Sequence, residues 1–179
     1  MNILILYGTV EGQTQKISEY MADILRKHGH SVLTMSITDE LSEIALEKFH
    51  AVIIGGSIHM GNYSSPLTNF VKAHTNWLND SVSAFFTVCM GIHSAETKSR
   101  EEASHYGEKF LAETGWTPRL NETFAGAVKY TRYNFFIRFI MKRISRKEGA
   151  STDTTRDHEY TDWDKVTKFT EDFLSNLTS

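Results

Sequence analysis

The amino-acid sequence predicts an α/β fold in which helices cover both faces of a doubly wound parallel sheet. Short apolar runs of the kind that form buried parallel strands alternate with segments of helical periodicity. Strands and helices in this alternation form parallel βαβ units. The chain has 179 residues, two prolines and no internal repeat or low-complexity linker. We therefore expect one domain over residues 1–179.

The first half of the chain predicts three strands and one long helix. The helix carries Ile17, Met21 and Leu25 on one face, and Gly29 supplies a natural C-cap. The first strand is an apolar run that stops at Gly8, and the second alternates weakly. In order, these elements are a strand at 2–7, a helix at 14–28, a strand at 31–36, a short helix or turn at 41–48 and a strand at 50–56.

The second half predicts two more strands, separated from the last helix by a long excursion. Pro66 opens a helix, Gly115 closes another, and Thr161 with Asp164 forms an expected capping box. A connection as long as the one at about 129–160 is functional or disordered in most compact domains. The elements are a helix at 66–77, a strand at 84–90, a helix at 99–114, a strand at 123–128, the insertion at about 129–160 and a helix at 161–177.

Composition excludes several classes of protein. The hydrophobic content of 40% and charged content of 23% are ordinary for a globular domain. We expect no signal peptide and no membrane span, because a basic leader and an apolar run of ~18 residues are both lacking. The lone Cys89 is expected to be a buried structural thiol in a reducing compartment. We expect no metal site, since there is no HExxH motif and no Cys/His cluster.

The loop after the first strand is a candidate anion site. It opens a helix, whose first N–H groups and dipole favour a negatively charged group. It contains no Lys or Arg, so we expect neutral donors to hold a phosphate there. It is neither a GK[ST] P-loop nor a GxGxxG loop, and an ordinary strand–helix turn is the alternative. Its residues are Thr9, Val10, Glu11, Gly12, Gln13 and Thr14.

Two further loops are expected to meet the first one at the carboxyl edge of the sheet. Ligands of doubly wound sheets bind in this crevice, where the strand order reverses. The loops GGSIHMGNYSSP and CMGIHSAETK carry small, polar and aromatic residues suited to flanking a flat ring, with His59 and Tyr63 as ring contacts. Together the loops favour a phosphorylated planar ligand. The candidate contacts outside the first loop are Ser57, Ile58, His59, Gly61, Met90, Gly91 and Ile92.

These motifs carry a specific resemblance. TVEGQT at 9–14 resembles the FMN phosphate loop of flavodoxins, Thr/Ser-x-x-Gly-x-Thr, and the whole chain resembles the menaquinone-dependent protoporphyrinogen dehydrogenase family of flavodoxin-like proteins. The chain departs from that family at Val10, where a basic residue is expected, and over residues 90–100. The matching segments are GQT at 12–14, GxSIxxGxY at 55–63, AGAxxYxRY at 125–133, TDT at 152–154 and YTDW at 160–163.

The resemblance implies a flavodoxin-like sheet of order 2-1-3-4-5 and FMN as cofactor. It also implies oxidation of protoporphyrinogen IX to protoporphyrin IX in haem biosynthesis, with menaquinone or ubiquinone as electron acceptor. Such a protein would lie on the cytoplasmic face of the inner membrane as a peripheral protein. Because the flavin supplies the hydride chemistry, we expect no obligate catalytic acid or base among the side chains.

The insertion is both basic and apolar. Residues 128–149 hold seven Lys or Arg and one acid, a net charge of +6, whereas the whole chain carries −3. On a helical wheel an apolar stripe (Phe136, Ile137, Ile140, Met141, Ile144) opposes a polar side (Arg138, Lys142, Ser145, Arg146), with Arg143 and Lys147 at the edges. This pattern is typical of a helix in an anionic membrane interface. A helix packed onto the sheet with a solvated basic face is the alternative.

Chemistry suggests roles for the remaining residues of the insertion. Lys129 or Arg132 is suited to pair with porphyrinogen propionates, and Tyr130, Tyr133 and Phe135 to line an apolar surface for the macrocycle or quinone. Two alternatives remain open: an electron-transfer flavodoxin, which needs no basic insertion, and an FMN quinone reductase fed by a nicotinamide cofactor. A receiver-type module is rejected because acidic residues are missing after strands one and three. Nucleic-acid binding is disfavoured because aliphatic residues interrupt the basic patch.

Overall fold

The computed structural model describes residues 1–37, 44–132, 139, 142–143, 145–146 and 149–177. Five parallel strands form the central sheet in the order β2-β1-β3-β4-β5, which confirms the predicted fold class and strand order. All five run in parallel register with their neighbours. The strands are β1 (Asn2–Gly8), β2 (Ser31–Ser36), β3 (Ala51–Ser57), β4 (Val82–Val88) and β5 (Leu120–Phe124).

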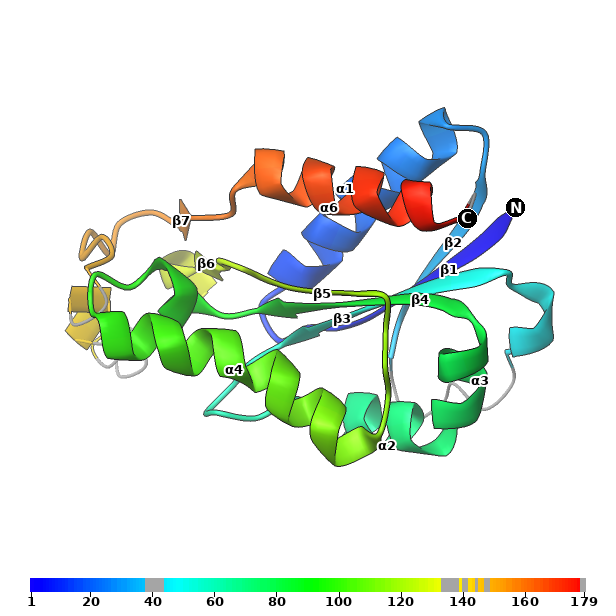
Figure 1. Cartoon of the computed structure of the whole chain (residues 1–179). Coiled ribbons are helices and arrows are strands. Elements are labelled where there is room, and N and C mark those ends of the chain that lie inside the picture. The colour runs from blue at the N-terminus through cyan, green and yellow to red at the C-terminus, as the bar shows by residue number, and fades with distance from the viewer. Residues whose placement is uncertain (38–43, 133–138, 140–141, 144, 147–148, 178–179) are drawn as a thin grey trace.

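Helices lie on both faces of the sheet (Figure 1). One face is covered by α1 (Gln13–Lys27) and α6 (Trp163–Leu177), and the other by α2 (Ser65–Ala73), α3 (Thr75–Asp80) and α4 (Thr97–Thr114). Ile3 and Ile5 of β1 pack against α1 and α6, and Leu4 and Leu6 pack on the opposite face with α2, α3 and α4. Because β1 is buried on both faces, it needs apolar residues at consecutive positions. Short 3-10 helices complete the chain at η1 (Leu46–Lys48), η2 (Met90–His93) and η3 (Tyr130–Arg132).

The predicted fifth strand at 123–128 is wrong in its bounds. The observed strand starts at Leu120, which pairs with Ala84, and stops at Phe124, where the β4 register ends. The following apolar residues form β6 (Ala127–Val128), which pairs antiparallel with β7 (His158–Glu159) in a separate small sheet. This pairing brings the two ends of the insertion together at the edge of the main fold.

Two helix boundaries also differ from the prediction. The predicted helix at 66–77 is divided between α2 and α3, and the Thr75 hydroxyl donates to the Val71 carbonyl oxygen at 2.7 Å. The predicted capping box at Thr161 is absent: its hydroxyl donates to the Ala125 carbonyl oxygen at 2.8 Å. Asp162 is the N-cap of α6 instead, because its carboxylate accepts a hydrogen bond from the backbone N–H of Lys165 at 3.0 Å.

Across the described ranges, none of the helices combines the length and the apolar character that crossing a membrane requires. Within the same ranges, no three His, Cys, Asp or Glu side chains come together as metal ligands would.

Candidate functional site

A cavity of about 340 Å³ opens at the carboxyl ends of β1, β3 and β4. Its volume lies in the range of small-molecule sites. The three loops predicted to meet there do so, and the connection between β5 and β6 closes the fourth side. The lining residues are Thr9, Val10, Glu11, Gln13, Thr14, Ser57, Ile58, His59, Met60, Val88, Cys89, Met90, Gly91, Gly126 and Ala127.

The N-terminus of α1 points into this region without a side-chain cap. Gly12 occupies its N-cap position with φ of +87°, in the left-handed region that favours glycine. The Gly12 N–H donates to the Thr9 hydroxyl oxygen at 2.9 Å, which folds the loop back over the helix start. The first turn of α1 carries no acidic residue. An uncapped helix start of this kind offers its backbone donors to an external anion.

Three buried polar atoms beside this loop lack partners. The Thr14 hydroxyl oxygen, the Gln13 amide oxygen and the Ser18 hydroxyl oxygen make no hydrogen bond to a described residue. Thr14 is fully buried and lines the cavity. Because buried polar groups are almost always hydrogen-bonded in native proteins, the Thr14 hydroxyl calls for an oxygen-rich ligand group at the loop.

A strained turn forms one rim of the cavity. His59 and Asn62 exchange backbone hydrogen bonds of 2.9 and 3.1 Å around Met60 and Gly61, both of which have positive φ. Such a turn requires two left-handed residues, a conformation that costs a non-glycine residue about 1–2 kcal/mol. Met60 is 88% exposed, and Val10 on the facing loop is 59% exposed. Two apolar side chains therefore stand in solvent at the mouth of the site.

The predicted contacts fall into two groups. Most of those outside the first loop line the cavity, namely Ser57, Ile58, His59, Met90 and Gly91, whereas Gly61 and Ile92 do not. Tyr63, the second expected ring contact, is not in the wall either. Its hydroxyl lies 2.7 Å from the Thr87 hydroxyl, its ring packs against Phe85 and Phe110, and burial raises the pKa of its phenol.

The sequence prediction missed the cavity residues of the β5–β6 connection. It also missed two residues that lie next to predicted contacts. Gly126 and Ala127 line the cavity because the loop after the fifth strand ends at the same edge as the other loops, which the rule for doubly wound sheets anticipates. Met60 and Cys89 also line it. Cys89 was expected to be buried, but the residue is only partly buried, because it follows the last residue of β4 and lines the cavity. The predicted fourth strand at 84–90 is accordingly observed at Val82–Val88.

The chain that returns from the insertion is bonded to α1. The Lys16 ammonium lies 2.5 Å from the Glu159 carboxylate, and the Gln13 amide donates to the Thr161 hydroxyl at 2.9 Å. Lys16 also lies over the Trp163 ring, 5.1 Å from its centroid. Burial alone would raise the pKa of Glu159, but hydrogen bonds from Lys16 and Trp163 outweigh it and lower that pKa. These bonds attach the returning end of the insertion to α1, the helix that follows the loop at 9–14.

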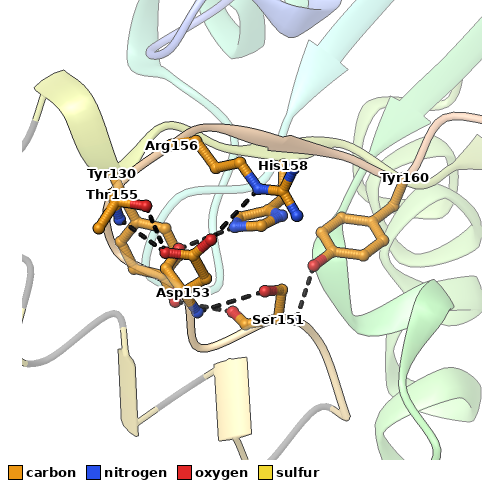
Figure 2. Close-up of polar contacts among 7 residues, drawn as sticks. All are labelled: Tyr130, Ser151, Asp153, Thr155, Arg156, His158 and Tyr160. Atoms are coloured by element: carbon orange, nitrogen blue, oxygen red, sulfur yellow. Dashed lines mark hydrogen bonds and ion pairs between the residues drawn. The ribbon is translucent and has the colours of Figure 1, made fainter.

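The base of the insertion is an interlocked polar unit (Figure 2). The Tyr130 hydroxyl donates to the Ser151 carbonyl oxygen at 3.1 Å, and the Ser151 N–H donates to the Tyr160 hydroxyl at 2.7 Å. The Asp153 carboxylate accepts from the N–H and hydroxyl of Thr155, and these bonds lower the pKa of Asp153. Tyr160 packs its ring 4.5 Å from that of His93 in η2. The unit is therefore attached to the 90–93 wall of the site.

The structure describes several of the residues in the insertion that were predicted to contact the substrate or the membrane. Tyr130 is fully buried, so it presents no apolar surface to a macrocycle, and that expectation is corrected: its hydroxyl donates to Ser145 at 2.8 Å. Ser145, on the polar side of the predicted helix, is itself buried. Arg143 and Arg146 are helical and exposed, and Lys142 is helical and half-buried. The side chain of Arg132 and all of Tyr133, Phe135, Arg138 and the predicted apolar stripe lie outside the described residues.

Lys129, predicted to bind substrate, lies next to Gly12. Its ammonium nitrogen is 3.8 Å from the position that a Cβ on Gly12 would occupy. The loop at 9–14 therefore has a cation beside it, although the sequence pattern predicted neutral donors only. The signal was hidden because Lys129 is separated from the loop by more than a hundred residues and approaches it through the β6–β7 pairing.

Comparison with known proteins agrees with this geometry. Residues 4–155 match the flavodoxin domain family. The oxidised flavodoxin 1 of Bacillus cereus superposes with a TM-score of 0.59 at 14% identity, covering 98% of both chains. A flavodoxin from the domain Archaea gives 0.58 at 15% identity over the whole of both. Fold and cavity thus define a flavodoxin-domain protein with its ligand site at the carboxyl edge of the sheet.

Two relatives of higher sequence identity identify the family within the flavodoxin-domain proteins. The protoporphyrinogen IX dehydrogenase (quinone) of Escherichia coli strain K12 is 35% identical over 178 residues, which span 99% of this chain and 97% of that protein. The protein of the same name from Leishmania major is 34% identical over 172 residues, 96% of this chain and 74% of that protein. The chain belongs to this dehydrogenase family, which confirms the predicted family and the prediction of an enzyme within it.

The bond between Lys16 and Glu159 makes the attachment of the insertion dependent on pH. The pKa of Glu159 is lowered on folding, so its contribution is present above the unfolded value of about 4.5 and is lost as pH falls through the folded value. In a double-mutant cycle of Lys16→Met and Glu159→Gln, we expect a coupling free energy of about 0.5–1 kcal/mol at pH 7. As pH falls through this lowered folded pKa, the coupling should vanish, as measured by urea unfolding. A coupling independent of pH would contradict the assigned ion pair.

Proposed function

We propose that this protein oxidises protoporphyrinogen IX to protoporphyrin IX on bound FMN and passes the electrons to a membrane quinone, menaquinone or ubiquinone, in haem biosynthesis. The observation that carries the proposal is the cavity at the carboxyl ends of β1, β3 and β4, with an uncapped α1 and a buried, unpartnered Thr14 hydroxyl at its base. The names of the relatives from Escherichia coli and Leishmania major support the choice of substrate and acceptor.

The residues of the cavity fit FMN. The phosphate would accept hydrogen bonds from the α1 N-terminus and from Thr14, whose hydroxyl otherwise lacks a partner. The loops at 57–60 and 89–91 offer His59, Met60 and Met90 as walls for a flat ring. When bound, the flavin supplies the hydride chemistry, and the protein positions it. The side chains of the cavity then bind and orient the cofactor.

The rim of the cavity suits a large apolar substrate. Met60 and Val10 are exposed apolar side chains on two loops that line the cavity, and a ligand that covered them would remove apolar surface from water. Methionine is unbranched and adapts to irregular surfaces, so Met60 is suited to lie against a tetrapyrrole. Arg132, which ends η3 at the base of the insertion, remains our candidate for pairing with a propionate.

The insertion is our candidate for the membrane contact, placing the protein on the cytoplasmic face of the inner membrane. Its exposed helical residues include Phe139, which is 56% exposed, together with Arg143 and Arg146. An aromatic ring beside exposed cations is the combination found in interfacial helices. Ser145 of this segment is buried against the protein through its bond with Tyr130. Contact with anionic lipid would bring the site close to quinones dissolved in the membrane.

The overall reaction is tested by anaerobic mixing of the FMN-loaded protein with protoporphyrinogen IX. We expect the flavin absorbance to bleach and then to recover when a quinone is added. NADPH alone should reduce the flavin slowly or not at all, because the described fold has one mononucleotide crevice. Fast reduction by NADPH without protoporphyrinogen would favour the quinone-reductase alternative, and slow reaction with both donors would favour an electron-transfer flavodoxin.

The phosphate loop is tested with two matched glycine variants. Gly12 and Gly29 have φ of +87° and +83° at opposite ends of α1, so alanine at either position should cost about 1 kcal/mol of stability. Only Gly12→Ala should weaken FMN binding, by about tenfold or more, because it alters the backbone that approaches the phosphate. Titration of the apoprotein with FMN measures the dissociation constant. Equal affinities in the two variants would place the phosphate elsewhere.

Membrane association is tested by reversing the described cations of the insertion, with Lys142→Glu, Arg143→Glu and Arg146→Glu combined. Each cation near an anionic surface contributes about 1 kcal/mol, so binding to anionic vesicles in a flotation assay should fall by about a hundredfold. FMN should be retained, and activity with a long-tailed quinone should fall more than activity with a water-soluble acceptor.

The control for this test reverses three exposed cations on α2 and α4, Lys72, Lys98 and Lys109, and so changes the net charge equally. The control protein should still float with the vesicles. Loss of flotation in both proteins would indicate a general effect of net charge, and flotation of both would show that the insertion does not hold the membrane.

A further inference from the structure

Lys129 is a half-buried lysine whose position no part of the proposed reaction explains. It follows β6 directly, and its ammonium nitrogen lies 3.8 Å from where a Cβ on Gly12 would be. Gly12 is the N-cap residue of α1 and the centre of the loop at 9–14. The cation therefore stands over the uncapped helix start, beside the backbone donors that would meet an anion.

The backbone on either side of Lys129 is held firmly. Val128 is buried and pairs with His158 in the β6–β7 ladder. Tyr130 is fully buried, and its hydroxyl donates to both Ser145 and the Ser151 carbonyl oxygen. With both neighbours held in the protein interior, the backbone of Lys129 is fixed next to the loop, and its ammonium group is within reach of Gly12.

The charges around this ammonium leave room for an anion. Among the described residues, no carboxylate is within ion-pair distance of Lys129, whereas the neighbouring Lys16 is engaged by Glu159. A phosphate monoester carries about −1.5 to −2 at neutral pH, so a nearby cation would stabilise it. The buried Thr14 hydroxyl, which lacks a partner, lies on the same loop and points independently to a bound oxyanion.

We propose that Lys129 is a binding residue for the phosphate of the flavin cofactor and makes the site selective for a phosphorylated flavin over riboflavin. The inference rests on the proposed FMN site and adds to it a cation from the insertion. It also gives the β6–β7 pairing a role in cofactor binding, because the ladder carries the lysine to the loop. Pairing of Lys129 with a substrate propionate is the competing assignment.

The test compares Lys129→Met, which removes the charge at similar volume, with Lys129→Arg, which keeps it. Lys109→Met on α4 removes one exposed positive charge outside the cavity lining and serves as the control. Apoprotein of each full-length variant is titrated with FMN and with riboflavin. A charge-assisted hydrogen bond to phosphate predicts a loss of FMN affinity of about tenfold to a hundredfold in Lys129→Met. Lys129→Arg should retain most of the affinity, and riboflavin should bind all four proteins equally.

Two further readouts separate a phosphate contact from a structural effect. Raising the salt concentration should weaken FMN binding to the parent more than to Lys129→Met, because screening acts on the ion pair. Inorganic phosphate should raise the melting temperature of the parent apoprotein and of Lys109→Met more than that of Lys129→Met. Equal losses for FMN and riboflavin, or unchanged FMN affinity, would overturn the role of Lys129 while leaving the FMN site intact.

Failure of the proposed function has a different signature. A parent apoprotein that binds neither FMN nor riboflavin would overturn the flavin site itself, and the role of Lys129 with it. Unchanged FMN affinity together with a raised KM for protoporphyrinogen in Lys129→Met would assign the lysine to the propionate.

Discussion

The position of β1 at the centre of the sheet is the constraint on which the rest of the molecule depends. It pairs with β2 on one side and β3 on the other, so the chain winds in opposite directions from this strand. The reversal leaves a crevice at the carboxyl edge that no helix covers. Both faces of β1 must be apolar, and the polar residues that follow it are free to serve a ligand. The positions of the loop at 9–14, the cavity and the start of α1 all derive from this placement.

The insertion is bound to this framework at several points, although it leaves the main sheet. Lys16 with Glu159 and Gln13 with Thr161 attach its returning end to α1, and the ring of Tyr160 packs against His93 at the opposite wall. Surface ion pairs are individually weak, yet here they act beside the buried Tyr130 and its two hydrogen bonds. The described ends of the insertion are therefore bonded to elements that line the cavity.

Strain is concentrated at the mouth of the cavity. Met60 holds a left-handed backbone conformation in the turn between His59 and Asn62, and its side chain extends into solvent. A glycine or asparagine there would relieve the turn. The buried hydroxyl of Thr14, which lacks a hydrogen-bond partner among the described residues, is a second unfavourable feature at the same cavity. Such features gathered at one cavity are typical of functional sites.

The sequence by itself determined the strand–helix alternation, the loop at 9–14 and most cavity residues, because these follow from local periodicity and from the rule for doubly wound sheets. Tertiary structure decided the rest. The end of β5 depends on the register with β4, and the burial of Tyr130 depends on Ser145 and Ser151. The approach of Lys129 to Gly12 depends on a strand pair whose members are about thirty residues apart. Contacts between distant segments leave no periodic signal, so only the folded chain reveals them.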